Sequence, residues 1–178
     1  MAKSCVTYAL KGMGQECEGS ASGLKRLLIG LSREWTVTPG SAHTATISAS
    51  TTGSPSFYEY YITEESTSLT STLNVNNANG VKYYSNTINA TFIRMRPEKH
   101  IELQALANEK LVVIVQDNNG QYWVVDNASA SAETAQSGQA FDDLSGYQLE
   151  ITSRTAVLPY AIDAGNLPSI DTPDVYES

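Results

Sequence analysis

Few residues of this chain are able to act as nucleophiles, bases or metal ligands. Its two histidines, His43 and His100, lie far apart, and its two cysteines, Cys5 and Cys17, both lie near the N-terminus. A pair of cysteines with no histidine nearby makes a poor zinc site, and one pair cannot staple a fold of this length. We therefore expect two reduced thiols, which could close only a local loop if they paired, and no metal or cofactor.

The histidines and carboxylates favour structural roles over catalysis. His100 stands beside Lys99 in a helical segment and His43 in a Thr/Ser-rich loop, where solvated surface histidines are the commoner case. The adjacent carboxylates at 64–65 and 142–143 are candidates for a glycosidase acid pair, but neighbours on a strand point to opposite faces. No GxSxG, HExxH, CxxC or phosphate-loop motif occurs in the sequence. We expect a protein that is not an enzyme.

Composition describes one strand-rich domain without the features of a nucleic-acid-binding or membrane protein. The chain has 178 residues, of which 41% are apolar and 17% charged, with 10 tyrosines and 12 glycines that suit strands and turns. A net charge of -8 and a pI near 4.7 exclude the basic face of ordinary duplex-binding proteins. The sequence contains no run of 18 apolar residues, and its first 15 residues hold no apolar stretch long enough to predict a secretory leader. We expect synthesis in the cytoplasm and no membrane partner.

The chain divides into three parts. Residues 1–23 are rich in Gly and Ser and predict an extended N-terminal arm that needs a partner to become ordered. Residues 24–162 carry the periodic apolar segments and predict a β-rich domain with one helix. Residues 163–178 hold four acidic side chains and two prolines without periodicity. We expect this acidic C-terminal tail to fold only against a neighbouring subunit.

Alternating apolar and β-branched residues predict the strands. We expect strands near residues 24–35, where a short helical stripe is the alternative, and near 44–48, 57–62, 66–75, 81–95, 111–116, 121–125 and 146–153. Asn79-Gly80 and Asn119-Gly120 predict turns between paired strands. The second turn resembles the start of a calcium loop, but Ala128 stands where that loop needs glutamate. Residues 126–140 are rich in Ala and Ser and predict a flexible loop.

One segment predicts a helix, near 97–109. Pro97 suits the first helical position, and Glu98 in the first turn complements the helix dipole. The expected core consists of apolar residues from the strands: Leu69, Leu73, Val75, Ile88, Phe92, Val113, Val115, Trp123, Tyr147 and Leu149.

Basic residues gather around this helix in an otherwise acidic chain: Arg94, Arg96, Lys99 and Lys110. One interpretation is a solvated helix face whose cations pair with Glu98, Glu102 and Glu109. The other is an interface with the acidic tail of an adjacent copy, formed by Asp163, Asp171, Asp174 and Glu177. Opposite potentials of this kind set register and association rate more than affinity.

The central sequence resembles the structural tail proteins of tailed bacteriophages, closest to those of phages of Bacteroides-like bacteria. The similar part covers roughly residues 60–160 and includes SLTSTLNVNNANGVKYYSNTINATFIRMRPEKHIELQALANEKLVVIVQDNNGQYWVVDN, followed by GYQLEITS. Its marks are the Ser/Thr-rich strand ending in LNV, the FIRM strand before the helix, the apolar strand with its NG turn and Tyr-Trp, and the late GY strand.

The resemblance implies a tail-tube-like fold and role. The fold would be mainly β, with two packed antiparallel sheets in a sandwich or barrel-like arrangement and one flanking helix. Copies would form a homo-oligomeric ring, and stacked rings would build a channel in the virion tail for genome delivery. The expected partners are copies of the chain and other tail or neck proteins, with no small-molecule substrate. A negative wall rich in Ser, Thr and Asn would repel phosphate, so phage DNA would pass without specific binding.

Two other functions stay open. A head-tail adaptor, neck ring or capsid decoration protein could share the same core. A carbohydrate-binding β-sandwich module is the alternative from another class, because five aromatic residues could form a sugar platform: Tyr58, Tyr60, Tyr61, Tyr122 and Trp123.

Overall fold

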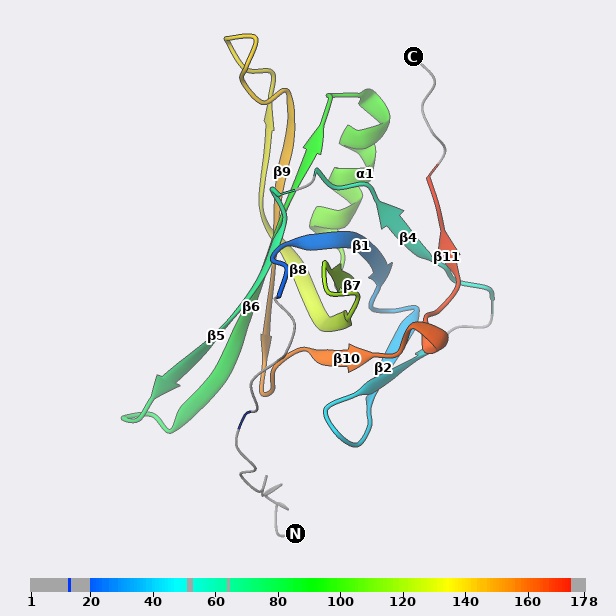
Figure 1. Cartoon of the computed structure of the whole chain (residues 1–178), viewed down its shortest axis with the longest axis vertical. Coiled ribbons are helices and arrows are strands. Elements are labelled where there is room, and N and C mark those ends of the chain that lie inside the picture. The colour runs from blue at the N-terminus through cyan, green and yellow to red at the C-terminus, as the bar shows by residue number, and fades with distance from the viewer. Residues whose placement is uncertain (1–12, 14–19, 51–52, 64, 174–178) are drawn as a thin grey trace.

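The computed structural model describes Met13 and residues 20–50, 53–63 and 65–173 (Figure 1). Strands make up 54% of the residues and helices 10%. This composition confirms the expected fold class, mainly β with two sheets and one α-helix in the described part of the chain. Most of the predicted arm, residues 1–23, lies outside the described residues.

The expected strand segments and the expected helix all form. The strands are β1 (Leu24–Leu31), β2 (Trp35–Pro39), β3 (Ala45–Ala49), β4 (Phe57–Tyr60), β5 (Ser68–Asn76), β6 (Val81–Ile93), β7 (Leu111–Asp117), β8 (Tyr122–Gln136), β9 (Gly146–Thr155), β10 (Tyr160–Ile162) and β11 (Ile170–Asp171). Helix α1 spans Pro97–Asn108 and the 3-10 turn η1 spans Ala164–Asn166. As predicted, α1 begins with a proline, whose missing N–H is not needed there.

The two sheets differ greatly in size. Nine strands form one large sheet in the order β11-β4-β1-β7-β8-β9-β6-β5, with β10 added beside β8, and β2 and β3 form a separate hairpin. All neighbours in the large sheet are antiparallel except β11 and β4, which run parallel.

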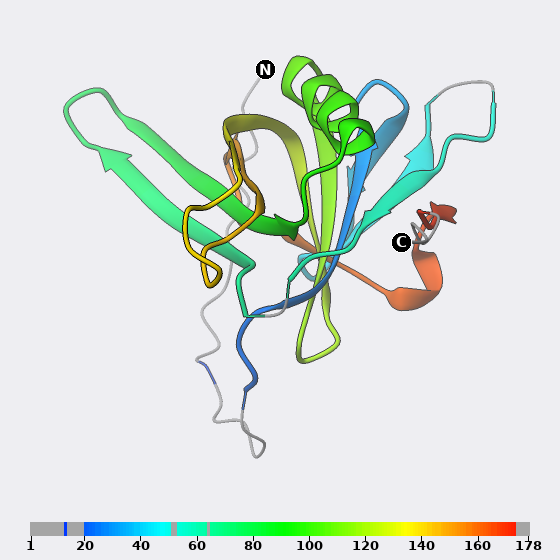
Figure 2. The same ribbon diagram turned by 90° about the horizontal axis from the view of Figure 1, so that it is seen from above.

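Strand β8 joins two halves of the large sheet. Its first half pairs with β7 up to Ala128, and its second half pairs with β9 from Ser129 onward. The half that contains β7, β1 and β4 lies among the helix, the β2–β3 hairpin and β10. The other half, β8 to β5, extends away from this body (Figures 1 and 2). We call this second half the blade.

Strand β7 lies at the centre of two cores. All of its residues from Leu111 to Val115 are buried, as expected for a continuous apolar run that is covered on both faces. Leu111, Val113 and Val115 belong to a first core with residues of α1, β6 and β9. The side chains of Val112 and Ile114 belong to a second core with residues of β2, β3 and β10. The strand therefore holds the helix layer and the hairpin layer to opposite faces of one sheet.

The predicted loop at 126–140 is wrong over most of its length. Strand β8 continues to Gln136, and its residues pair with β9 across a bulge between Ala130 and Ala132. The small Ala and Ser side chains here have little β-propensity of their own, so the extended backbone is fixed by hydrogen bonding to β9. Only residues 137–145 form the loop between the two strands.

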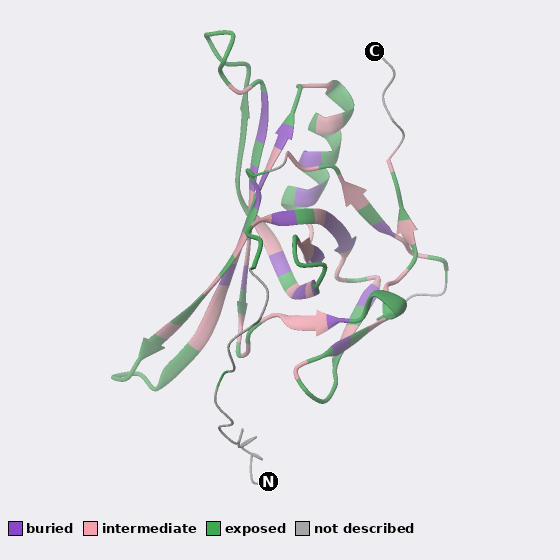
Figure 3. Ribbon diagram, viewed as in Figure 1, coloured by how far each residue is buried: buried purple, intermediate pink, exposed green. Residues whose placement is uncertain are grey.

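The predicted core is correct for six residues: Ile88, Phe92, Val113, Val115, Tyr147 and Leu149 are buried. Leu69 and Trp123 are half-buried and pack against the first core. The prediction is wrong for Leu73 and Val75, whose exposed fractions are 52% and 48%. They lie where the β5–β6 hairpin extends past the body, coloured green and pink in Figure 3. Apolar and polar residues alternate there as in a strand with one buried face, but no described residue covers the apolar face.

The start of the predicted acidic tail folds on its own chain rather than only on a neighbour. Ile170 and Asp171 of β11 pair with Phe57 and Tyr58 of β4. Leu167 and Ile170 pack against the second core. This contact removes their apolar side chains from water, which is favourable. Residues 174–178 lie outside the described residues.

A matched pair of leucines on the blade tests where the core ends. Leu149→Ala should lower the free energy of unfolding by about 2–5 kcal/mol, because its side chain is only 2% exposed. Leu73→Ala should lower it by about 1 kcal/mol or less. Chemical denaturation of the two variants measures both values. Equal losses would mean that the outer hairpin is covered as well as the centre of the blade.

Candidate functional site

A cavity of about 590 Å³ opens between α1, β4, the end of β6 and the chain after β11. Tyrosine and phenylalanine side chains form much of its wall: Tyr58, Tyr60, Tyr61, Phe92 and Tyr147. Asp171, Thr172 and Pro173 form one rim and the start of α1 forms another. Segments that are distant in the sequence therefore build one concave surface, which we call the aromatic cavity.

Tyr60 fixes the helix to the sheet inside this cavity. Its hydroxyl donates a hydrogen bond to the carboxylate of Glu102 on α1, and its ring lies 6.1 Å from that of Phe92. Burial, and then the bond to Glu102, raise the pKa of the Tyr60 phenol well above its ordinary value. The phenol therefore stays protonated at neutral pH and serves as a donor.

Tyr147 holds the connection between β6 and α1. Its hydroxyl accepts a hydrogen bond from the Arg96 amide (3.1 Å) and donates one to the Arg96 carbonyl (3.2 Å). The Arg94 amide donates to the Ser145 carbonyl at 2.7 Å, and Arg94 has a φ of 65°. These bonds place the basic residues that precede α1 at the rim of the aromatic cavity.

Three cations gather at that rim: Arg94, Arg96 and Lys99. The Lys99 ammonium donates to the carbonyls of Ile93 (2.6 Å) and Arg94 (3.2 Å). Burial, and then the positive charges of Arg96 and Arg94, lower the pKa of Lys99. Lys110, the fourth member of the predicted patch, follows the far end of α1 and does not line the cavity.

Two carboxylates that line the cavity, Glu59 and Glu102, bind neighbouring side chains. Glu102 accepts the bond from Tyr60, and Glu59 forms an ion pair with Arg26 at 2.6 Å. Glu109, which could have paired with the helix cations, binds Arg33 at 2.8 Å instead. The wall of the cavity is thus largely aromatic and apolar, and its rims carry the cations of the start of α1 on one side and the Asp171 carboxylate on another.

The sequence-predicted catalytic candidates have structural partners. His43 Nε2 lies 3.1 Å from the carbonyl oxygens of Leu158 and Pro159, and the His100 ring packs edge-on against Tyr147. Asp143 accepts hydrogen bonds from the amides of Gln139 and Ala140, at 2.8 Å each. These bonds lower the pKa of Asp143 and fix a turn.

The remaining acidic candidates give no sign of a catalytic or metal site. Asp117 accepts bonds from the Gln121 amide (2.9 Å) and the Trp123 indole (3.1 Å), as turn chemistry predicts. Glu65 is exposed, and its neighbour Glu64 lies outside the described residues. Across Met13 and residues 20–50, 53–63 and 65–173, no three His, Cys, Asp or Glu side chains gather closely enough to hold a metal ion.

The five aromatics of the proposed sugar platform do not share one surface. Tyr122 is buried in the second core, and the half-buried Trp123 packs against the first core with its indole bonded to Asp117. Only Tyr58, Tyr60 and Tyr61 line the aromatic cavity. The prediction of a single five-residue platform is wrong, because the two neighbours on β8 point to opposite faces of the sheet.

The blade presents a second candidate surface, a wide face made mostly of small polar side chains. Directly paired residues share a face, and the registers place the following on the side away from the core: Ser68, Thr70, Thr72 and Asn74 of β5, Ser85, Thr87, Asn89 and Thr91 of β6, Gln148, Glu150, Thr152 and Arg154 of β9, and Ser129, Ala132 and Thr134 of β8. Val81 and Tyr83, near the β5–β6 turn, share this face. Glu150 and Arg154 are its only charged members. We call this surface the polar face. No strand or helix of the described residues packs on it.

The blade ends in a free edge. Within the described residues, strand β5 is the last strand in the sheet order and pairs only with β6. Its nine residues, SLTSTLNVN, contain no charge and no proline. At the other end of the sheet, β4 is covered by the chain's own β11.

Comparisons of the chain with protein-family profiles, curated proteins and solved structures find no match. The resemblance to phage tail proteins therefore stays a prediction from the sequence. Among the described residues, no helix has the length and apolarity needed to cross a membrane.

Replacing Tyr60 should change how stability depends on pH. Because the folded-state pKa of Tyr60 is raised above the ordinary value of 10.0, the folded protein binds this proton more tightly than the unfolded chain does. Its contribution is complete below pH 10 and is lost as pH rises above it. Tyr60→Phe should therefore lose less stability than the wild type between pH 9 and 11, measured by urea unfolding.

The control for this prediction is Tyr61→Phe, because Tyr61 lies in the same segment but is 62% exposed. It should keep the steep wild-type dependence. Identical curves for the wild type and Tyr60→Phe would contradict the role given to the Tyr60 hydroxyl.

Proposed function

We propose that this chain is a non-enzymatic structural protein of a bacteriophage virion, a tail-tube-like subunit that forms homo-oligomeric rings. The observation that carries the proposal is the blade, which combines a free, uncharged edge strand with a broad face of small polar side chains. The family resemblance of residues 60–160 supports the same function.

The edge of β5 is suited to pairing with another chain. Monomeric proteins commonly protect a long edge strand with lysines, prolines or a covering segment. Strand β5 has no lysine or proline within Ser68–Asn76, and no strand among the described residues pairs with its outer side, so it offers about 30 Å of backbone at 3.4 Å per residue. A ring of identical subunits removes this exposed edge, because the edge of each blade is covered by its neighbour.

The polar face is suited to line a channel through which DNA passes. DNA is retained on proteins by clustered Lys and Arg, which release counterions from phosphates. Here the single cation Arg154 lies over the Tyr83 ring at 5.8 Å and is balanced by Glu150 on the same face. The sequence led us to expect a negative wall, but the residues assigned to this face are neutral in sum. We expect weak DNA binding because this hydroxyl- and amide-rich surface carries few cations.

The location and partners follow from this function. The protein would be made in the cytoplasm of the bacterial host and would reside in the virion tail. Its partners would be its own copies in stacked rings and other tail or neck proteins. A head-tail adaptor ring or a capsid decoration protein is the alternative; purified protein that forms tubes favours the tail, and protein that stays monomeric but binds capsids favours decoration.

Lysines on the edge strand should prevent ring formation. Thr70→Lys with Thr72→Lys places two charges on β5, which should leave a folded monomer because both positions are exposed. Light scattering after size exclusion and negative-stain class averages give the oligomeric state. The control is Thr134→Lys with Gln148→Lys, which adds the same charge to exposed positions of interior strands and should still form rings. Edge variants that assemble like the wild type would refute the role of β5.

The same control variant tests the polar face. Two lysines facing the channel should convert a passive wall into one that holds double-stranded DNA, with binding that weakens steeply as salt rises. Filter binding at 50 and 200 mM salt compares the Thr134→Lys, Gln148→Lys variant with the wild type, which should retain little DNA at either concentration. Strong DNA binding by the wild type would contradict the proposed passive wall.

A further inference from the structure

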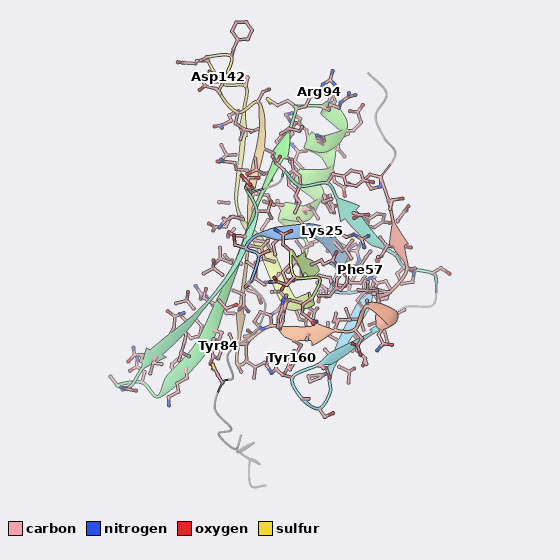
Figure 4. The ribbon with its side chains drawn as sticks, viewed as in Figure 1. Lys25, Phe57, Tyr84, Arg94, Asp142 and Tyr160 are labelled. Carbon is pink, nitrogen blue, oxygen red and sulfur yellow. The ribbon has the colours of Figure 1, made fainter. Side chains whose placement is uncertain are left out.

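The loop between β8 and β9 ends in a fully exposed phenylalanine. Phe141 makes no burying contact within the described chain, although an aromatic ring gains more than most side chains from burial. The loop lies at the tip of a long hairpin that projects from the body (Figures 1 and 2). Figure 4 shows Asp142 at its outer end.

The loop backbone is fixed rather than loose. The Asp143 carboxylate accepts the amides of Gln139 and Ala140, and the Asp143 amide donates to the Ala140 carbonyl at 3.1 Å. Gly138 has a φ of 70°, and a Cβ there would lie 2.6 Å from the Cβ of Asp143. This turn therefore holds Phe141 and Asp142 outward in one defined arrangement.

The aromatic cavity has the shape and chemistry to receive this tip. Its volume of about 590 Å³ accommodates a phenyl ring, and its wall includes Phe92, Leu103 and Tyr147. The charges are complementary at one end of the cavity: residues 137–145 carry two carboxylates and no cation, whereas Arg94 and Lys99 lie at the rim formed by the start of α1, which is not the rim that carries Asp171.

The positions of tip and cavity fit neighbouring copies in the same orientation. Asp142 and Arg94 lie toward the same end of the long axis in Figure 4. Arg94 marks the end of the cavity next to the base of this hairpin, since its amide binds the Ser145 carbonyl. The β4 and β11 wall of the cavity lies on the side of the molecule away from the blade (Figure 1). A contact from one side of a subunit to the opposite side of the next is heterologous, and it closes into a ring when the rotation fits.

We propose that the tip of the β8–β9 loop of one copy inserts into the aromatic cavity of the next copy. Phe141 packs against the aromatic wall, and the Asp142 carboxylate pairs with Arg94. This inference rests on the proposed self-association and names one of its contacts.

Self-association of the full chain tests the proposal, measured by sedimentation equilibrium. Phe141→Ala should weaken each intersubunit contact by about 10- to 100-fold, the loss expected for an aromatic side chain that is no longer buried. Ile101→Ala is the control, because Ile101 is also an exposed apolar residue, at 71%, but lies on neither surface. It should associate like the wild type.

A charge reversal identifies the partners. Asp142→Arg and Arg94→Asp should each weaken association, and the double variant should recover most of the loss. Aspartate is chosen at position 94 because it tolerates the positive φ found there. Recovery in the double variant is not expected from a merely structural role of either residue.

The outcomes separate this inference from the proposed function. A wild type that stays monomeric would overturn both. A wild type that forms rings, together with Phe141→Ala and charge-reversal variants that form them equally well, would overturn only the loop contact. Loss of rings on removing residues 174–178, with Phe141→Ala unaffected, would identify the C-terminal segment of the neighbour as the occupant and would also overturn it.

Discussion

The rest of the structure depends on the backbone pairing of β8 with two different strands. Its first half hydrogen-bonds to β7 inside the two-core body, and its second half hydrogen-bonds to β9 in the blade. Because one continuous strand takes part in both, the blade is held to the body by sheet hydrogen bonds and by the first core. Its direction is set by the twist of a sheet and not by a linker. Strand β8 therefore sets the positions of the free edge, the polar face and the loop at 137–145 relative to the body.

The molecule keeps two electrostatic environments apart. The polar face has one acidic and one basic side chain in a field of hydroxyls and amides. The rim of the aromatic cavity concentrates three cations, which the hydrogen bonds of Tyr147 and Lys99 hold at the start of α1. Exposed charges interact over about 10 Å at moderate salt. A nearly neutral surface and a basic one can therefore coexist in one small acidic chain.

The fold was largely predictable from the sequence because its strong signals are local. The run at 111–116, the Asn119-Gly120 turn and Pro97 each act within a few residues and predicted β7, its hairpin and the start of α1. The second half of β8 was missed because Ala and Ser carry no periodic signal, and only its partner β9 makes it a strand. Leu73 and Val75 were assigned to the core because alternation reports which side chains share a face. Whether anything covers that face depends on tertiary structure.

The candidate site was predictable only in its parts. The basic residues before α1 and the tyrosines of β4 were both recognised in the sequence, but as separate features. Their meeting in one cavity depends on the pairing of β1 with β4 and on the chain after β11. The pairing of β4 with β11 joins residues more than 100 positions apart, and no local pattern encodes either contact. The sugar platform failed for a different, local reason: Tyr122 and Trp123 are neighbours on one strand, so their side chains point to opposite faces of the sheet.

The two ends of the large sheet are chemically unlike, because β11 covers β4 whereas no strand of the described part of the chain covers β5. Two copies that pair through their β5 strands would leave no exposed edge, and assembly would end at a dimer. Copies that join the β5 edge of one subunit to the β4–β11 side of the next would all have the same orientation. An assembly of the second kind has a direction. Its front and back would present different residues, so a protein that caps one terminus would not fit the other, and growth could start from a single defined base.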